Sequence, residues 1–551
     1  MSGTISEPKL NWLLNLLKNI LDEQHISKFV PYKSIMFNKG LHLLLFFFLI
    51  SCFSFGQTKA LPKSKEVKQI NLLHADIGKF SSISGKSAQR LIGNVKAEHE
   101  GSMLYCDSAY LYNNNSIDAF GNVHINVNDT LDMYGDQVFY DGNTKIAEFH
   151  DHVRLVDKQA TLYTDILIYD RKIGIGQYFI WGRIEDSVNV LTSKKGYYYN
   201  QIETVFFKDS VVVVNPDYIM KSDTLKYETK FERIHFMGPT TITGDSSYLY
   251  SERGYHDSKT KESKLTQNAY VQNKTNILHG DSIYYNKELG LAKAYYDVLL
   301  IDTAQDVTVT GEYAIYNKRD LYAYVVDSAQ AIFAQNQDSL FLHADTLILR
   351  FDSLEKAKHL LAYNHMKFFK SDVQGMADSM AYDIQDSIMR LFQNPVIWLE
   401  GNQISCNRID LISKNEKLDS AAFLKDVFLV SQDTVDPQFY NQLSGNNMYA
   451  WFVDGDLRKL FMDGNSETIY FLWEEDGTPI GMNKIQSKNM LIYIRNQELE
   501  TITYIEKPTA TLTPTPLVNP LDTKLRGFQW REDIRPKKRA DIFKKESVGE
   551  K

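Results

Sequence analysis

A phrase of alternating apolar and polar residues returns along this chain with a period of about thirty residues. One copy, GNVHINVNDTLDMYGDQVFYDGN at 121–143, holds two apolar alternations, each beside turn-forming residues. A single hairpin of this kind is marginally stable in water, because neither strand can bury its apolar face alone. The chain must therefore stack many such units, so that each buries its apolar face against its neighbours.

The first series within the repeat opens on a short polar residue, usually an aspartate, and continues with alternating apolar residues. Its members begin at Asp107, Asp136, Asp165, Asp223, Asp281, Glu312, Asp345, Asp378 and Asn407, with weaker copies at 195–200 and 244–250. The second and fourth positions after the opening residue are mostly apolar or aromatic, and side chains two apart share one face of a strand. They predict a continuous apolar stripe with a largely exposed opposite face, as in an antiparallel sheet.

A second series interleaves with the first and places turn-forming residues before a valine. It includes GNV at 93–95 and 121–123, DHV at 151–153, DSV at 209–211, AYV at 269–271, YDV at 296–298, NPV at 394–396 and KDV at 425–427. Gly, Asn, Asp and Pro favour turns, so each unit is predicted as strand, turn, strand, turn. The expected fold is all-β: an elongated, repetitive antiparallel β-jellyroll, solenoid or open sandwich of about thirteen two-strand units.

The recurring aspartate could be interpreted as a catalytic carboxylate, but its periodicity argues against that. Catalysis needs one or two carboxylates in an asymmetric environment, not one in every repeat. A short polar side chain that closes an Asx-type turn explains the period directly. We therefore assign these acids a structural role.

Other chemistry has no recognisable pattern in this sequence. The histidines show no metal-ligand spacing, HDH at 150–152 fits an ordinary exposed turn, and nucleophile, phosphate-loop and dinucleotide fingerprints are missing. A net charge of -8 does not suggest a nucleic-acid partner. We expect no enzyme activity, no cofactor, no metal and no nucleic-acid binding.

The N-terminal region has the layout of an export signal. In MFNKGLHLLLFFFLISCFSFGQ, residues 36–57, a basic start precedes a short apolar core and small residues before Gln57. About fifteen apolar residues are too few to span a bilayer. We predict a signal peptide at 36–56, and residues 1–35 as an over-extended start or a leader. The LISC motif makes lipidation of Cys52 an alternative, but the apolar residues after it favour cleavage before Gln57.

Two further cysteines, Cys106 and Cys406, remain after the predicted signal peptide. Exported cysteines can pair, but a linear stack would separate these two by about ten repeats, on the order of 50 Å at one strand spacing each. A disulfide requires Cα atoms within roughly 7 Å. Both are predicted to be small buried residues in strands.

The repeated phrases resemble the OstA/LptA family of lipopolysaccharide-transport proteins. The phrases that carry the resemblance are GNV at 93 and 121, DSAYLY, GDQVFYDGNTKIAEF and ADTLILRFD, and it covers roughly residues 65–500. It implies a twisted, V-shaped β-jellyroll whose apolar interior carries the acyl chains of lipid A across the periplasm. It also implies partners: lipopolysaccharide, other transport proteins of the inner and outer membranes, and end-to-end self-association.

The apolar stripe supplies candidate groove residues for such a lipid. They are Val123, Ile125, Val138, Tyr140, Leu167, Tyr169, Leu225, Tyr227, Ile283, Tyr285, Leu347 and Met380. Other classes stay open: a structural or adhesive surface β-solenoid without lipid, an outer-membrane barrel partner of the same pathway, or a polysaccharide-active β-helix.

The expected organisation has a lead-in at 57–90, jellyroll repeats at 91–260, further repeats at 261–504 and a tail at 505–551. The period is disturbed near 250–265, so the repeats could form one long bridge or two fused jellyrolls. The tail begins rich in Pro and Thr, which favours extended chain. It ends basic, as an exposed segment or one that docks on an acidic partner or lipid phosphates.

Overall fold

The computed structural model describes residues 68–544, apart from short gaps at 84–85, 128–130, 159, 274–275, 304–305, 335–338, 354–356, 400, 415–416, 454–455 and 496–497. The predicted signal peptide, Cys52 and residues 1–35 lie outside the described residues. The described chain divides into two compact units, which we call the first unit, 68–203, and the second unit, 204–544. No helix within the described part is long and apolar enough to cross a membrane.

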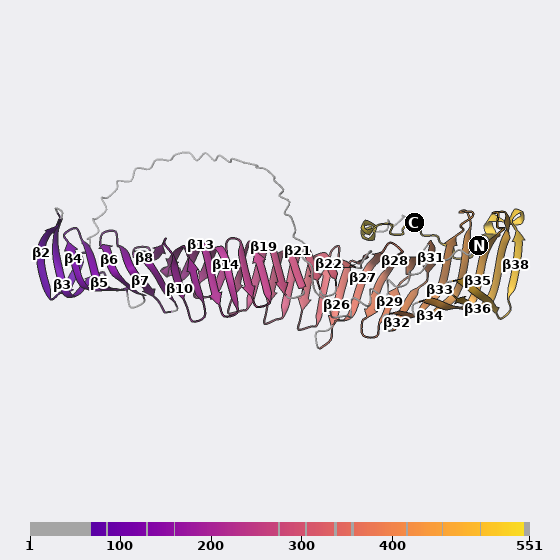
Figure 1. Ribbon diagram of the computed structural model, residues 1–551, viewed down its shortest axis with the longest axis horizontal. Helices are drawn as coiled ribbons and strands as arrows, with labels where there is room; N and C mark the ends of the chain where they lie inside the picture. Colours follow the sequence, from indigo (N-terminus) through magenta and orange to yellow (C-terminus); the bar gives the residue numbers. More distant parts are fainter. Residues whose placement is uncertain are drawn as a thin grey trace, which may run out of the picture. The chain divides into compact units, whose positions relative to one another are not determined.

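The first unit is built of β-strands that follow one another along the chain (Figure 1). They are β1 (Asn71–His74), β2 (Ile77–Ile83), β3 (Lys86–His99), β4 (Ser102–Tyr112), β5 (Ser116–Val127), β6 (Leu131–Asp141), β7 (Ile146–Val156), β8 (Thr161–Asp170), β9 (Ile175–Tyr178), β10 (Gly182–Glu185), β11 (Val190–Ser193) and β12 (Lys195–Tyr199), followed by the 3-10 turn η1 (Asn200–Ile202).

The second unit continues the same pattern. Its strands as far as β27 are β13 (Thr204–Asn215), β14 (Tyr218–Glu228), β15 (Arg233–Phe236), β16 (Thr240–Gly244), β17 (Ser247–Ser251), β18 (Arg253–Asp257), β19 (Glu262–Asn273), β20 (Asn276–Asn286), β21 (Leu291–Asp302), β22 (Val307–Asn317), β23 (Tyr322–Val326), β24 (Gln330–Phe333), β25 (Leu340–His343), β26 (Thr346–Phe351) and β27 (Ala357–Phe369).

The remaining elements complete the second unit. They are β28 (Val373–Asp383), β29 (Ile388–Phe392), β30 (Val396–Leu399), β31 (Asn402–Ser405), β32 (Arg408–Lys414), β33 (Lys417–Gln432), β34 (Tyr440–Val453), β35 (Asp456–Trp473), β36 (Pro479–Arg495), β37 (Glu498–Ile505), β38 (Thr509–Pro514) and the 3-10 turns η2 (Thr515–Leu517), η3 (Pro520–Asp522) and η4 (Arg539–Phe543). The all-β prediction is confirmed. The count of about thirteen units stays a prediction.

Neighbouring strands pair antiparallel, and nearly every long pair shifts its register once near the middle. In β5 the shift falls between Phe120 and Val123, and the two residues between them are Gly121 (φ 73) and Asn122 (φ 46). Two successive residues in the left-handed region turn the strand sharply without ending it. We call each such point a corner.

The corners correct the prediction that every GNV-type motif is a turn between two strands. GNV at 121–123 lies inside one strand, β5, and DHV at 151–153 lies inside β7. Gly, Asn and Asp tolerate the left-handed conformation in a bulge as readily as in a turn. The motif therefore marks positive φ but does not distinguish a corner from a strand end.

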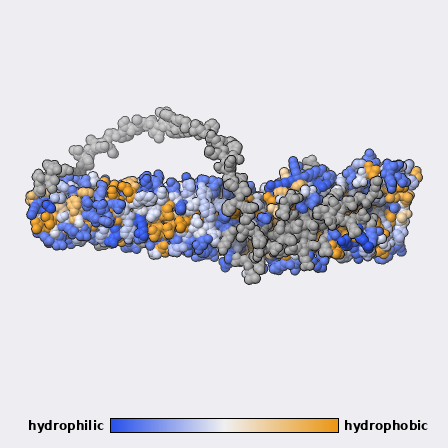
Figure 2. All heavy atoms as spheres, viewed as in Figure 1, coloured by the Kyte–Doolittle hydropathy of each residue, from blue (hydrophilic) through white to orange (hydrophobic). Residues whose placement is uncertain are grey.

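At each corner a strand passes from one layer of hydrogen-bonded strand segments to another. We call these two layers the A leaf and the B leaf. In the first unit the A leaf contains 95–99, 102–106, 123–127, 131–135, 153–156 and 161–164, and the B leaf contains 86–92, 108–112, 116–120, 137–141, 146–150 and 166–170. Buried apolar residues alternate with exposed ones along both leaves. The core therefore lies between the leaves, and the outer surface in Figure 2 is mostly hydrophilic with separate hydrophobic patches.

Both cysteines are buried and free, as predicted. Cys106 lies in β4, whereas Cys406 lies at a corner between β31 and β32. Burial raises the pKa of the Cys106 thiol to about 11 and that of Cys406 to about 12. The thiolate is the nucleophilic form, so burial lowers the reactivity of both thiols.

The period disturbance near 250–265 does not interrupt strand pairing within the second unit. β17 and β18 are two segments on either side of Glu252, and both pair with β19. The 247–273 segment therefore preserves the two-leaf pattern, which gives no support to a break between two jellyrolls there.

The C-terminal segment is not a free tail in the described residues. β38 pairs with β36, and 515–544 then lies across the outer face of the second unit; we call 515–544 the strap. Gln442 donates to the carbonyl of Thr523 and accepts from the N–H of Leu525, both at 2.8 Å. Gln403 makes the same pair of bonds, at 2.7 Å, to Gln529 and Arg531.

Apolar side chains complete the contact between strap and strands. Leu525 is 4% exposed and belongs to a buried cluster on β33, β35 and β36, against which Phe528 and Trp530 also pack. Burying a large apolar side chain is worth roughly 1.5–3 kcal/mol. The strap is therefore a structural part of the second unit.

Candidate apolar groove

One cross-strand row of the first unit lines the deepest part of the interior. Its members are direct partners on neighbouring strands of the B leaf: Leu91, Ala109, Ala119, Val138, Phe149 and Leu167. Each is at most 1% exposed. Two predicted groove residues, Val138 and Leu167, belong to this row. Contact between these residues and a lipid stays a prediction.

A matching row on the A leaf forms the opposite wall of the first unit's interior. It runs through Ala97, Leu104, Ile125, Met133, Leu155 and Leu162, which are also direct partners. All are buried, and Ile125 is 7% exposed. Val123, another predicted residue, is 1% exposed beside the corner.

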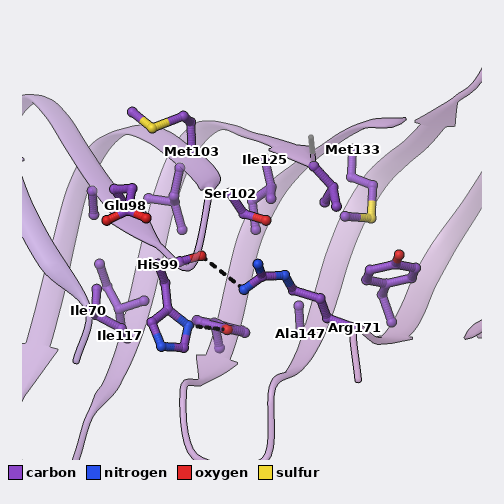
Figure 3. A pocket seen from close by; sticks show the side chains of 15 residues that line it. Ile70, Glu98, His99, Ser102, Met103, Ile117, Ile125, Met133, Ala147 and Arg171 are labelled. Carbon is purple, nitrogen blue, oxygen red and sulfur yellow. Dashed lines mark hydrogen bonds between the residues drawn. The ribbon is translucent and has the colours of Figure 1, made fainter. Parts of the chain in front are cut away.

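A cleft opens between the two leaves of the first unit at the side away from the corners (Figure 3). Its walls include the predicted residues Ile125, Tyr140 and Tyr169, and its volume is about 40 Å³. One water needs roughly 10–15 Å³ of such space, so the cleft is narrow. The side chains of the two leaves fill most of the interior here.

Polar side chains bridge the mouth of this cleft, and we call His99, Glu100, Tyr140, Lys145 and Arg171 the clasp. Arg171, in the turn after β8, donates to the carbonyls of His99 (2.9 Å) and Glu100. Lys145, in the turn after β6, forms an ion pair with Glu100. The His99 ring lies 2.6 Å from the Tyr140 hydroxyl. Together these bonds join the β3–β4 turn of the A leaf to the B leaf. Figure 3 draws the bonds of His99 and Arg171 at this mouth.

The second unit contains one long apolar row on its B leaf. Direct pairing links Leu225, Phe236, Gly254, Leu265, Ile283, Ala294, Ala314, Val325, Leu347, Ala362 and Met380. Four predicted groove residues are in this row, namely Leu225, Ile283, Leu347 and Met380, and each is at most 5% exposed. The predicted stripe is thus continuous from strand to strand.

The A-leaf row of the second unit is far less covered. Its members are Met220, Ile242, Leu249, Val271, Leu278, Leu300, Val309 and Ala331. The end members Met220 and Ala331 are buried, whereas Leu300 is 37% exposed and the others are half-buried. We call Ile242 to Val309 the open row. Tyr227 is half-buried, and Tyr285 is 43% exposed on the B leaf.

The recurring acids lie at the corners. Asp107 accepts from Asn122 at 2.8 Å, and Asp136 bonds to His152 at 2.7 Å. Each bond joins the acid to the left-handed pair on the next strand, half a period further along the chain, so the acid links neighbouring strands and does not close an Asx turn in its own strand. The bond to Asp136 raises the pKa of His152. No group of three or more metal-ligating side chains occurs among the described residues.

Sequence reasoning missed the clasp and the strap. Arg171 and Glu100 are single charged residues in turns with no periodic counterpart, and their contact spans more than two repeats. The strap was recognised only by its composition. Its docking depends on glutamines of distant strands, and isolated glutamines carry no sequence signal.

Two family models match the groove-bearing segments. One, described as OstA-like protein, matches residues 67–223, and the other, described as LptA/(LptD N-terminal domain) LPS transport protein, matches residues 186–290 and 334–417. The chain is an OstA/LptA-like protein. No curated protein matches the sequence.

Solved structures supply a further comparison. One match is the crystal structure of LptH, described as the LptA homologous periplasmic component of the conserved lipopolysaccharide transport device from Pseudomonas aeruginosa. It has 16% sequence identity and a TM-score of 0.19, over 21% of this chain and 81% of that chain.

The family matches divide this OstA/LptA-like protein into two kinds of region. Every predicted groove residue from Val123 to Met380 lies inside a matched segment. The strap and the strands after residue 417 lie outside both matches. The predicted groove residues therefore lie in family-matched segments, whereas the strap does not.

Proposed function

We propose that this protein shields the acyl chains of lipopolysaccharide in its apolar interior during transport across the periplasm to the outer membrane. The observation that carries the proposal is the unbroken B-leaf row from Leu225 to Met380, whose two ends lie in segments matched by a lipopolysaccharide-transport model. Such a row offers apolar contacts at each of its strands except β18, where Gly254 stands.

The energetics of the cargo fit this role. Burying one methylene is worth ~0.8 kcal/mol, so exposing one fourteen-carbon chain to water costs on the order of 10 kcal/mol. A lipid with several chains needs a shield throughout an aqueous compartment. Shielding requires apolar contact and no bond making, so the proposal assigns no catalytic residue.

The open row is the best entry point for the lipid. Leu278, Leu300 and Val309 face the interior, yet remain half-buried or exposed where the first unit's equivalents are covered. An acyl chain on these side chains would remove apolar surface from water without first displacing a packed core. The B-leaf row would form the opposite wall.

Partners follow from the same architecture. Within the described residues β2 pairs with β3 on one side, and Phe80 on β2 is 86% exposed. An exposed strand edge can pair with another chain. We propose that terminal strands contact other transport proteins of the inner and outer membranes, or a second copy, end to end.

Site-specific photo-crosslinking in cells tests the lipid path. The photoreactive residue replaces Leu278, Leu300 or Val309, which face inward, and in parallel their neighbours Ile277, Ile301 or Thr308, which face outward on the same strands. We expect capture of lipopolysaccharide at the inward positions and little at the outward ones.

Two outcomes would contradict the conduit. Equal capture on both faces would mean nonspecific surface contact. No capture anywhere, from a folded and exported protein, would favour a structural or adhesive solenoid whose stripe is only a closed core.

A further inference from the structure

One corner of the first unit carries an exposed tryptophan where an earlier corner carries a polar residue. Trp181 is the counterpart of His152, because the residues two places after them, Arg183 and Arg154, each pair directly with the tyrosine two places before a corner acid. Trp181 has a φ of 49° and is 54% exposed. Bulky side chains rarely adopt this left-handed conformation, which Gly, Asn and Asp tolerate. The corner itself therefore gives no reason for a tryptophan at this position.

The tryptophan leaves the corner acid before it, Asp165, without the partner that earlier corner acids have. Asp107 and Asp136 bond to the polar residue of the next corner at 2.8 and 2.7 Å. The exposed Asp165 carboxylate forms no hydrogen bond or ion pair within the described part of the chain. The same holds for the guanidinium of Arg154, whose Cζ lies 4.4 Å from the centroid of the Tyr134 ring. One free acceptor and several free donors are thus left on the surface.

These groups share one open concavity on the outer surface of the first unit. Trp181, Asp165 and Arg154 all line it, and its volume is about 890 Å³. Binding sites for small molecules commonly measure roughly 300–1,000 Å³. The concavity lies on the outer face of the A leaf, because Arg154 is the strand neighbour of the inward-facing Leu155. It is therefore separate from the interior.

A stacked row of side chains forms one side of this concavity. The rings of His124 and Tyr134 stack at 4.5 Å with an interplanar angle of 6°. Arg154 lies on the other side of Tyr134, and the Cζ of Arg183 lies 6.0 Å from the centroid of the Tyr163 ring. Stacking holds these groups in place before a ligand arrives, which lowers the entropy cost of binding.

The charged side chains that line the concavity offset one another. Asp136 is bonded to His152, and Arg183 forms an ion pair with Glu185. The remaining carboxylate and guanidinium, which have no partner, carry opposite charges. The concavity therefore has no excess charge to attract an ion, and it is too polar for an apolar ligand. A neutral ligand rich in hydroxyl groups fits it best.

We propose that this concavity binds a neutral saccharide chain, with one sugar ring against Trp181. A sugar ring has a face of C–H groups that packs on an aromatic ring, and hydroxyl groups that both donate and accept. Asp165 accepts hydrogen bonds from these hydroxyls, and Arg154 donates to them. Because the site lies on the outer face, it does not depend on the proposed lipid path.

Calorimetric titration of the full chain with four probes tests the proposal. They are tri-N-acetylchitotriose, which is neutral, its cationic de-acetylated form chitotriose, the anionic trigalacturonate, and tetraglycine. We expect the neutral sugar to bind with a Kd below about 1 mM. Both charged sugars should bind at least about fivefold more weakly, because each brings a like charge to Arg154 or Asp165. Tetraglycine should not bind.

Three outcomes of this titration would overturn the proposal. One is a neutral sugar that does not bind at millimolar concentration. Another is a charged sugar that binds as tightly as the neutral one, which would mean that the site selects an ion. The third is tetraglycine binding as tightly as the sugar, which would indicate a peptide site.

Trp181→Asn separates a ligand role from a structural one. Asparagine tolerates the left-handed conformation, so thermal stability should stay the same or rise. Affinity for tri-N-acetylchitotriose should fall at least about tenfold, because the sugar loses its aromatic surface. Ile180→Asn is the matched control, since Ile180 is 55% exposed and does not line the concavity. Unchanged affinity in Trp181→Asn, or an equal loss in both variants, would contradict the site.

Arg154→Lys tests the planar donor while keeping the charge. Affinity for tri-N-acetylchitotriose should fall at least about threefold, because an ammonium cannot make the paired contact of a guanidinium. Arg90→Lys is the control: Arg90 is exposed and lies 5.8 Å from the centroid of the Tyr110 ring, outside the concavity. It should leave the affinity unchanged. An Arg154→Lys variant that binds as tightly as the unmodified chain would remove Arg154 from the site.

Discussion

The first unit and the second unit share a repeat but close their interiors differently. Ile125 and Leu300 occupy the same position, two residues after a corner valine, yet Ile125 is 7% exposed and Leu300 is 37% exposed. In the first unit the clasp joins the leaves across the cleft. In the second, the open row leaves apolar side chains accessible. The repeat therefore builds the stripe, and residues outside the repeat pattern decide whether it is covered.

The two units also differ on their outer faces. The strap covers strands of the second unit with buried apolar and glutamine contacts. These contacts stabilise a unit whose interior is partly open.

A buried charge should distinguish the units most strongly. Ile125→Asp places a carboxylate in a covered core and should cost more than about 4 kcal/mol of unfolding free energy. Leu300→Asp, at the equivalent position, should cost less than about 1 kcal/mol, because water already reaches it. Denaturant unfolding of both variants measures the difference. Equal costs would mean that the open row is closed in solution.

The strap gives the next largest expected effect. Leu525→Ala should destabilise the second unit by about 2–4 kcal/mol, because it leaves a cavity in a buried cluster. Leu521→Ala is the matched control, since Leu521 is 87% exposed, and should change stability by less than about 0.5 kcal/mol. Thermal unfolding compares them. A neutral Leu525→Ala would show that the strap is not docked.

The sequence predicted what repeats and missed what does not. Alternation identified the all-β class and the residues Leu225, Ile283, Leu347 and Met380, because side-chain facing in a strand depends only on spacing. It interpreted GNV as a turn, because positive φ serves corners and strand ends alike. The clasp and strap depend on contacts between residues far apart in the chain, which no local pattern encodes.

The smallest expected effect concerns the clasp and its dependence on pH. The hydrogen bond from Lys145 holds the pKa of Glu100 below its ordinary value of 4.5. A carboxyl group whose pKa is lower in the folded state than in the unfolded state stabilises the fold at any pH above its unfolded-state pKa. This stabilisation is lost as the pH falls through the folded-state pKa. Glu100→Gln keeps the shape without the charge. It should be less stable than the unmodified chain near neutral pH by no more than about 1 kcal/mol, since the pair is partly exposed.

The gap between the two proteins should close as the solution is acidified below the ordinary pKa of a glutamate, because protonation gives Glu100 the neutral side chain that the variant already has. Denaturant unfolding across that pH range measures the difference in unfolding free energy between the two proteins. Glu232→Gln, which breaks the Lys259–Glu232 ion pair of 3.6 Å in the second unit, controls for removal of one surface carboxylate. A gap that persists in acid would show that Glu100 acts through packing. The closure of the first unit would then rest on the carbonyl bonds of Arg171 and on the His99–Tyr140 bond, and the contrast with the open row would be one of geometry and not of charge.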